Sequence, residues 1–478
     1  MNWRPQLQYS IFTVLLMGIV CETCAFQAEY CFLQSFKSQQ QLITSDVTGR
    51  RIRLSACPKE KNRDEYVTNS TVTRCRSTFC LPLSSDQIKF IATSKRSTNV
   101  LGKISRTLFF WQNFDSDDKI STGTSVTFTY DYDLMKVGYD SRSRVLNTTG
   151  IVLIHPIGVG ISKWFYERLM SSLATTYYEG DFRKQNQRKN RFLVIAPDLL
   201  GSGSACNATM YKAGADSEPV EMTKYPLFNI SDWTSQIQHL MEDVEKTHVI
   251  DQWCVVANGG CSPIALQIAA KSVNSQHPIN HAQVSNVILS SVPRLPFFLR
   301  PNNTPAKVQK SYRILCGLPG NLFWWYACRN EGAFIQKFSE KNLVADPNNL
   351  GEKWRLDCYT NAKMNGGRSK YSTFAFLAGT LQDGCIESLR NLNGSDVSID
   401  VIKGGDIRQN RARSWFWQRK KPKTEEDDDT VTFRPYASFR DYVEKNGNRG
   451  QEVVIGGRIS LAHEDPCGYS RAMWNFLT

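Results

Sequence analysis

Short runs of nearly uninterrupted apolar residues constrain the fold of this chain more than any other feature. The clearest four cover residues 151–154, 192–196, 253–257 and 287–291. Strands of this kind are buried on both faces, as in a parallel sheet that is covered by helices on both sides. Further strand patterns are found at residues 108–111, 125–132, 397–402 and 452–455.

Helical patterns separate these predicted strands, at residues 164–175, 233–246, 263–272, 439–446 and 469–477. The alternation predicts an α/β fold with a mostly parallel, doubly wound sheet. Two segments interrupt it. Residues 294–376 have no strand pattern and many aromatic residues, and we interpret them as a helical cap inserted after the sixth strand. Residues 411–429 read as a charged, solvated loop.

These patterns divide the chain into regions. We expect the core in two parts, residues 104–293 and 377–478, with residues 81–103 as a connector. Residues 1–25 have the basic residue, short apolar run and small residues of a secretory signal peptide. Residues 26–80 are basic and rich in hydroxyls, as transit peptides are, and we expect them to be disordered.

The junction Ala25-Phe26, followed by such a stretch, resembles the bipartite presequence of algae with complex plastids. The resemblance implies a plastid location, and simple secretion is the alternative. The 14 cysteines are dispersed rather than arranged as a disulfide framework, which favours a reducing compartment. Six N-x-S/T sequons favour secretion slightly. No apolar run beyond the signal is long enough to cross a membrane.

Two segments resemble the α/β-hydrolase superfamily over residues 150–478. The first is the turn His155-Pro156-Ile157-Gly158, which matches the His-Gly turn whose amides help to form the oxyanion hole. Pro156 stands where the family usually has glycine. The second is the loop 196–204, close to the family's Asp-Leu-x-Gly-x-Gly-x-Ser pattern and mainly structural. The resemblance implies an α/β-hydrolase fold.

The nucleophile elbow of that family is also recognisable, and it lacks its serine. The matching residues are Ala257, Asn258, Gly259, Gly260 and Cys261, with small residues at both ends as the strained turn requires. Gly259 occupies the nucleophile position and cannot form an acyl-enzyme. Cys261 fills a small-residue position, and we interpret it as a buried structural thiol.

The last turn of the family pattern is altered as well. Aligned on Glu464-Asp465-Pro466, the chain has Ile459 in the histidine position, and His463 follows as a possible displaced base. Asp406 is the possible acid, although a shift of one step places Arg408 there. The sequence looks most similar to a cyanobacterial and plastid branch of the superfamily whose elbow has no serine.

Two functions therefore remain. The first is a pseudohydrolase that binds a protein partner or an apolar small molecule. The second is an active hydrolase with non-standard catalytic residues, acting on an ester or a lipid-like substrate. A convergent polar set at the strand ends would favour the second; its available members are His155, Asp198, Asn258, Asp406 and His463.

Composition narrows the partners. The net charge of +13, from 58 basic and 45 acidic residues, is modest for 478 residues. The basic residues form no stripe interleaved with aromatics, so we expect no nucleic-acid partner. We see no metal-ligand cluster and no phosphate-binding glycine loop, and we expect neither a metal nor a cofactor.

Overall fold

The computed structural model describes residues 72–84, 87, 125–139, 147–179, 190–211, 220–221, 225–274, 282–293, 304–382, 385–405, 443–444 and 447–477. The predicted strand 108–111, the charged loop 411–429 and most of the predicted helix 439–446 lie outside these residues.

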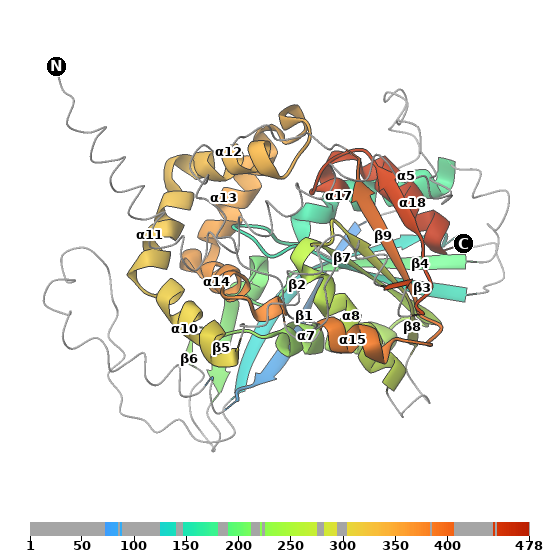
Figure 1. Ribbon diagram of the computed structural model, residues 1–478, viewed down its shortest axis with the longest axis horizontal. Coiled ribbons are helices and arrows are strands. Elements are labelled where there is room, and N and C mark those ends of the chain that lie inside the picture. The colour runs from blue at the N-terminus through green and yellow to red at the C-terminus, as the bar shows by residue number, and fades with distance from the viewer. Residues whose placement is uncertain are drawn as a thin grey trace, which may run out of the picture.

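One mixed sheet runs through the protein (Figure 1), in the order β10-β9-β8-β7-β3-β4-β2. Its parallel strands are β3 (Asn147–Ile154), β4 (Asn190–Pro197), β7 (Gln252–Asn258), β8 (Gln283–Ser290), β9 (Ser398–Gly404) and β10 (Glu452–Ile455). The strand β2 (Ser125–Val137) is antiparallel to β4. The prediction of a mostly parallel sheet is confirmed.

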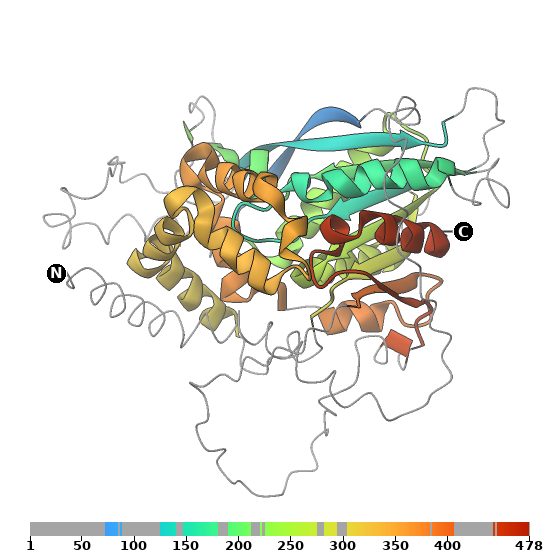
Figure 2. The ribbon, with the colours of Figure 1, turned by 90° about the horizontal axis from the view of Figure 1, so that it is seen from above.

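Helices cover both faces of the sheet. On one face, α5 (Glu167–Glu179) packs beside α18 (Pro466–Leu477), next to η5 (Lys163–Tyr166) and α17 (Leu461–Glu464). On the other, α7 (Ile230–Glu245), α8 (Ser262–Asn274) and α15 (Cys385–Asn391) contribute to a second buried cluster. Figure 2 shows α5 and α18 side by side. None of the helices in the described part is long and apolar enough to span a membrane.

The first strand lies earlier than the sequence analysis placed the folded part. The strand β1 (Val72–Pro82) pairs antiparallel with β2 along its whole length and buries Phe79 and Leu81. It overlaps the range 26–80, so the disorder expected for that range is wrong for residues 72–80. The strand was missed because Thr, Arg and Ser occupy most of its exposed first half. Two further short strands, β5 (Asn207–Tyr211) and β6 (Val220–Glu221), extend the sheet beside β2.

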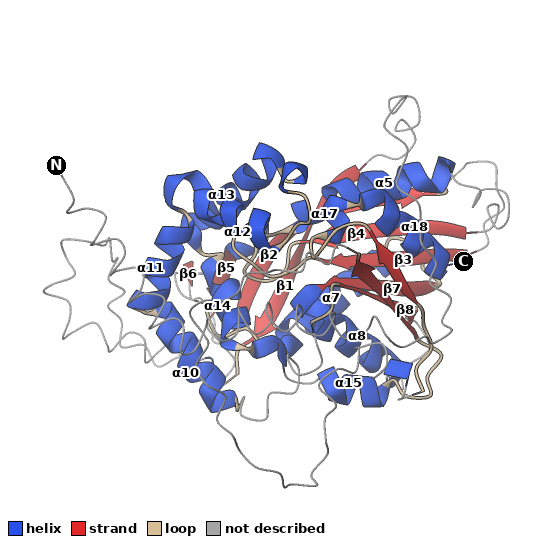
Figure 3. Ribbon diagram, turned by 45° about the horizontal axis from the view of Figure 1, so that its top comes forward, coloured by secondary structure: helices blue, strands red, loops and turns tan. Residues whose placement is uncertain are grey.

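Between β8 and α15, the described residues form five α-helices that we call the cap (Figure 3). They are α10 (Pro305–Cys316), α11 (Leu318–Ala327), α12 (Ala333–Asn342), α13 (Gly351–Gly367) and α14 (Lys370–Ala378). The aromatic residues of the segment are thus carried on helices, and the helices α13 and α14 face the ends of the strands through the contacts described below.

Candidate functional site

The elbow is a sharp connection between β7 and α8. Gly259 forms its tip with a φ of +59°, in the left-handed region that side chains disfavour. A Cβ placed on Gly259 would meet no heavy atom within 4 Å. The backbone therefore has the shape of a nucleophile elbow, and open space lies where a nucleophilic side chain would stand.

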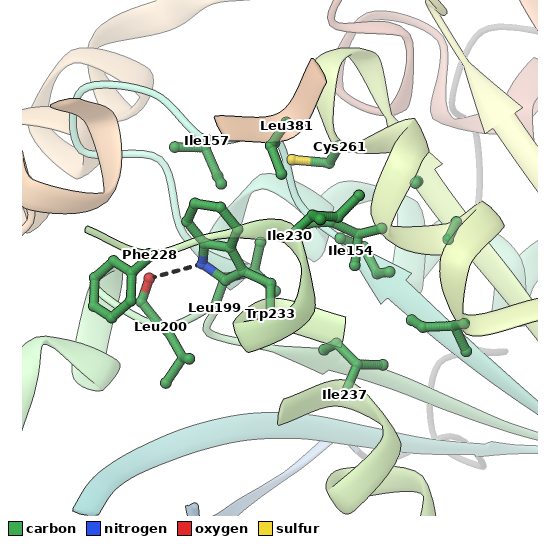
Figure 4. Close-up of a cluster of buried hydrophobic side chains, with 14 of the residues drawn as sticks. Ile154, Ile157, Leu199, Leu200, Phe228, Ile230, Trp233, Ile237, Cys261 and Leu381 are labelled. Atoms are coloured by element: carbon green, nitrogen blue, oxygen red, sulfur yellow. Dashed lines mark hydrogen bonds between the residues drawn. The ribbon is translucent and has the colours of Figure 1, made fainter. Parts of the chain in front are cut away.

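Cys261 and Ser262 are the two residues at the elbow that could replace the nucleophile, and both have structural roles. The thiol of Cys261 is fully buried, and burial raises its pKa to about 12. Figure 4 shows this side chain among apolar neighbours that include Ile157 and Leu381. The hydroxyl of Ser262 donates a 2.7 Å hydrogen bond to the carbonyl oxygen of Gly259. A thiol that stays protonated is a poor nucleophile, which agrees with a structural Cys261.

The loop after β10 carries Ile459 and is held by main-chain contacts. The carbonyl oxygen of Ile459 accepts a hydrogen bond of 2.7 Å from the Ser291 hydroxyl and a longer one of 3.5 Å from the Asn258 amide. Its N–H donates to the carbonyl oxygen of Leu343 at 3.1 Å. The loop is thus joined to the elbow strand and to the cap, but the aliphatic side chain of Ile459 cannot accept a proton.

Two residues are candidates for the acid position. Asp406 and Arg408 follow β9, and both lie outside the described residues.

His463 is buried in α17, where its ring packs against the cap and is not placed as a catalytic base. Its ring centroid lies 4.6 Å from that of Trp354 in the cap, in an edge-on arrangement. Burial, followed by the charge of Arg168, lowers the His463 pKa to about 3. Its Nε2 is buried and has no hydrogen-bond partner among the described residues. The ring is therefore neutral near pH 7 and a weak base.

His155 anchors the turn after β3, for which the sequence predicts an oxyanion hole. The backbone N–H of Leu199 donates to His155 Nε2 at 3.1 Å, so the ring proton resides on Nδ1, which faces the Pro156 carbonyl oxygen at 3.0 Å. Burial lowers the His155 pKa. The neutral ring joins the turn to the loop after β4. Pro156 has no N–H, so the turn has one backbone donor fewer than with glycine.

Asp198 organises that second loop. One carboxylate oxygen accepts from the backbone N–H of Lys163 at 3.0 Å, and the other accepts from the N–H and the hydroxyl of Ser204 at 2.9 and 2.7 Å. Gly203, with a φ of +51°, packs against this carboxylate so closely that a Cβ would collide with it. This contact requires a glycine at position 203 of the 196–204 motif. The Asp198 carboxylate has a structural role, because it holds the loop.

The cap packs directly on the loops at the carboxyl ends of the strands. The hydroxyl of Ser372 donates to the carbonyl oxygen of Gly201 at 2.8 Å, and that of Thr373 to Gly158 at 3.2 Å. A Cβ on Gly260 would lie 2.5 Å from the ring of Phe376. Neither Phe376 nor Ser291 was predicted to be part of the site, because neither belongs to a motif.

No protein-family model matches the chain, and a search of curated proteins found no match. Among solved structures, the epoxide hydrolase CorEH is similar at 13% identity, with 73% of this chain and 95% of that chain covered and a TM-score of 0.42. The peroxisomal α/β-hydrolase Lpx1 from Saccharomyces cerevisiae gives 13% identity, 85% and 88% coverage and a TM-score of 0.44. A haloalkane dehalogenase variant from Bradyrhizobium elkanii is 13% identical, with 72% of this chain and 92% of that chain covered and a TM-score of 0.40. Similarity this distant leaves the roles of individual residues to the geometry above.

Proposed function

We propose that this chain is a pseudohydrolase of a complex plastid, which binds a protein partner or an apolar small molecule instead of hydrolysing a substrate. One observation carries the proposal. The tip of the elbow is Gly259, with open space beside it, and the loop that would present a catalytic base carries Ile459. The fold is kept while the nucleophile and the base are both replaced.

Acyl transfer needs a nucleophile, a base that removes its proton, and donors for the oxyanion. Cys261 stays protonated, and Ser262 donates to the backbone. Neither is placed to attack a substrate. His463 is neutral and packed on Trp354. The elbow thus offers a shape for binding without the groups for this chemistry.

The space at the elbow favours an apolar ligand. It opens beside Gly259, and the neighbouring Gly260 is covered by the ring of Phe376 from the cap. A small apolar group entering there would contact an aromatic ring and backbone, in the manner of mostly apolar ligand sites.

The alternative is an active hydrolase with non-standard residues, acting on an ester or a lipid-like substrate. It needs polar side chains that converge on the elbow. His155 and Asp198 are committed to loop contacts, and the amide of Asn258 donates to the Ser290 hydroxyl at 3.0 Å. With His463 packed on the cap, the only member of the set left to this alternative is Asp406, which is not described.

A fluorophosphonate probe, which reacts with activated serines, tests the lost chemistry. We expect no labelling of the unmodified protein or of Gly259→Ala, and little labelling of Gly259→Ser, because one repaired triad member recovers almost nothing. The double variant Gly259→Ser, Ile459→His is the rescue test. Strong labelling of the unmodified protein at a serine near the elbow would overturn the proposal.

Native mass spectrometry tests the binding. A ligand held beside Gly259 should co-purify with the unmodified protein and with Gly259→Ala. It should be lost from Gly259→Leu, whose larger side chain fills the space. A ligand retained equally by Gly259→Leu would lie elsewhere, and the elbow would not be the binding site.

The location rests on the presequence. The signal peptide, the Ala25-Phe26 junction and the basic stretch behind it support import into a plastid. Six of the ten described cysteines are buried as free thiols, a state that a reducing stroma preserves. A fusion of residues 1–71 to a fluorescent protein in a diatom should label the plastid. Fluorescence in the medium would favour secretion.

A further inference from the structure

The helix α11 is apolar on both of its faces. Its inner face buries Trp324 and Ala327 in the cap. Its outer face carries Leu318, Trp325 and Tyr326, which are 62%, 56% and 43% exposed. With the half-buried Leu322, these residues stand at positions i, i+4, i+7 and i+8, which is one side of a helix. A helix on the surface of a soluble protein normally has polar residues on that side.

The neighbouring helices extend this apolar surface. Ile314 at the end of α10 is 38% exposed, and Phe338 of α12 is 39% exposed. The rings of Tyr326 and Phe334 lie 5.0 Å apart, which links α11 to α12. We call the exposed set the cap patch: Ile314, Leu318, Leu322, Trp325, Tyr326 and Phe338. In Figure 1, α11 lies at the outer edge of the cap, away from the sheet.

The segment that carries the cap patch is basic. Residues 305–342 contain six basic and two acidic side chains, a net charge of +4. The helix α10 has no acidic residue, and its Lys307, Lys310 and Arg313 are all exposed. The guanidinium of Arg329 lies 5.4 Å from the ring centroid of Trp325. Apolar and aromatic side chains rimmed by lysine and arginine form the pattern of a helix that lies in a membrane interface.

We propose that the cap patch binds the surface of an anionic membrane, with α11 lying in the plane of the lipid headgroups. Trp325 and Tyr326 suit the headgroup level, where amphipathic rings gather. Lys307, Lys310 and Arg313 would meet the anionic headgroups. The helix has ten residues, about half of what a membrane span needs, so it lies on the bilayer and does not cross it.

Charge also argues against the other occupants of such a surface. A second copy of this chain would bring the same net charge of +4 against the patch, and like charges repel. Lysine is depleted at protein interfaces, whereas α10, which carries Ile314 of this patch, has two exposed lysines. An anionic lipid surface satisfies both the apolar and the basic residues.

Vesicle flotation of the full chain tests the proposal. We expect binding to vesicles of phosphatidylcholine and phosphatidylglycerol in equal amounts, and little binding to phosphatidylcholine alone. Binding should weaken as salt is raised, because salt screens the attraction to the headgroups. Equal binding to both vesicles, or no binding to either, would overturn the assignment to an anionic surface.

Matched variants locate the binding. Leu318→Ser with Trp325→Ser should abolish flotation, while Val249→Ser should not, since Val249 is 82% exposed and precedes β7 at the opposite end of the strands. Lys307→Glu with Lys310→Glu should lower the affinity about 25-fold or more, since each of the two lost basic residues contributes about fivefold. Lys246→Glu is the control for charge. Thermal unfolding checks that each variant is folded.

Two outcomes would contradict the proposal. Unchanged flotation of both cap variants would place the membrane contact elsewhere. A dimer seen by sedimentation in the unmodified chain, lost in the Leu318→Ser, Trp325→Ser variant and accompanied by no vesicle binding, would assign the patch to a second copy.

Discussion

The hydroxyl of Ser291 donates a 2.7 Å hydrogen bond to the main-chain carbonyl oxygen of Ile459. This bond joins the end of β8 to the loop after β10, where the family resemblance places the catalytic base. Ser291 makes it from a backbone φ of +51°, in the left-handed region that costs an L-residue about 1 kcal/mol. The loop is thus held through its main chain, so an aliphatic side chain at Ile459 does not weaken this contact.

Two substitutions at Ser291 separate the hydrogen bond from the backbone strain. Ser291→Ala removes the bond and keeps the positive φ, so the free energy of unfolding should fall by about 1 kcal/mol. Ser291→Gly removes the bond but adopts this φ without strain, so it should lose less. Urea unfolding of the three proteins measures both. A glycine variant less stable than the alanine variant would show that φ is not strained there.

Docking of the cap can be measured with two glycines of similar backbone conformation. Gly160 and Gly259 have φ values of +70° and +59°. A Cβ on Gly160 would collide with the backbone of Cys358 in α13, whereas one on Gly259 would meet open space. Gly259→Ala should cost about 1 kcal/mol for its φ alone. Gly160→Ala should cost about 2 kcal/mol more, since overpacking adds to the strain.

Chemical unfolding gives both free energies, and protease sensitivity of the cap gives an independent readout. Gly160→Ala should expose the cap to cleavage, and Gly259→Ala should not. Equal stability of the two variants would mean that α13 is not held against the turn at Gly160.

The parts of this fold that sequence reasoning predicted are those fixed by local pattern. Uninterrupted apolar runs require burial on both faces, so the parallel strands β3, β4, β7 and β8 were predicted close to their observed bounds. The elbow was predicted from the family resemblance, whose pattern has small residues at both ends of the turn, and Gly259 has a positive φ there.

The remaining features depend on contacts between distant segments. The strand β1 is stabilised by pairing with β2 and has apolar burial only at Phe79, Leu81 and their neighbours, so its sequence resembles a loop. Ser291 and Phe376 gain their roles from Ile459 and Gly260, which are far away in the chain. No local sequence periodicity encodes contacts between segments so far apart in the chain.

The buried His463 should make the protein sensitive to acid. Its pKa in the folded protein is about 3, against about 6.5 in the unfolded chain. As the pH falls, the unfolded chain therefore binds the proton first. The stability that the neutral ring contributes is complete above about pH 6.5 and is lost between about pH 6.5 and pH 3.

His463→Phe keeps an aromatic ring against Trp354 and removes this titration. Between pH 7 and pH 5 the unmodified protein should lose about 2 kcal/mol more than the variant. Denaturant unfolding at pH 8, 7, 6 and 5 measures the difference, which should be nearly absent between pH 8 and 7. Parallel curves down to pH 5 would mean that His463 is not buried as a neutral ring.

If the proposed presequence is removed, the strand β1 limits where the cleavage can fall. Cleavage beyond Val72 would remove residues that pair with β2 along its length, from Val72 opposite Met135 to Pro82 opposite Ser125. It would also expose the apolar residues of β2 that Phe79 and Leu81 cover, at a cost of about 2 kcal/mol for each lost side chain. Recombinant chains that begin at residues 26 and 58 should therefore fold with similar melting temperatures.

A chain that begins at residue 83 leaves β2 as an unpaired edge, and such edges promote aggregation. It should elute as aggregates in gel filtration and unfold at a lower temperature than the two longer chains. The start of the protein purified from its source, measured by intact mass, should accordingly fall before Val72. A mature chain that begins after Pro82 and remains monomeric would show that β1 does not belong to the folded protein.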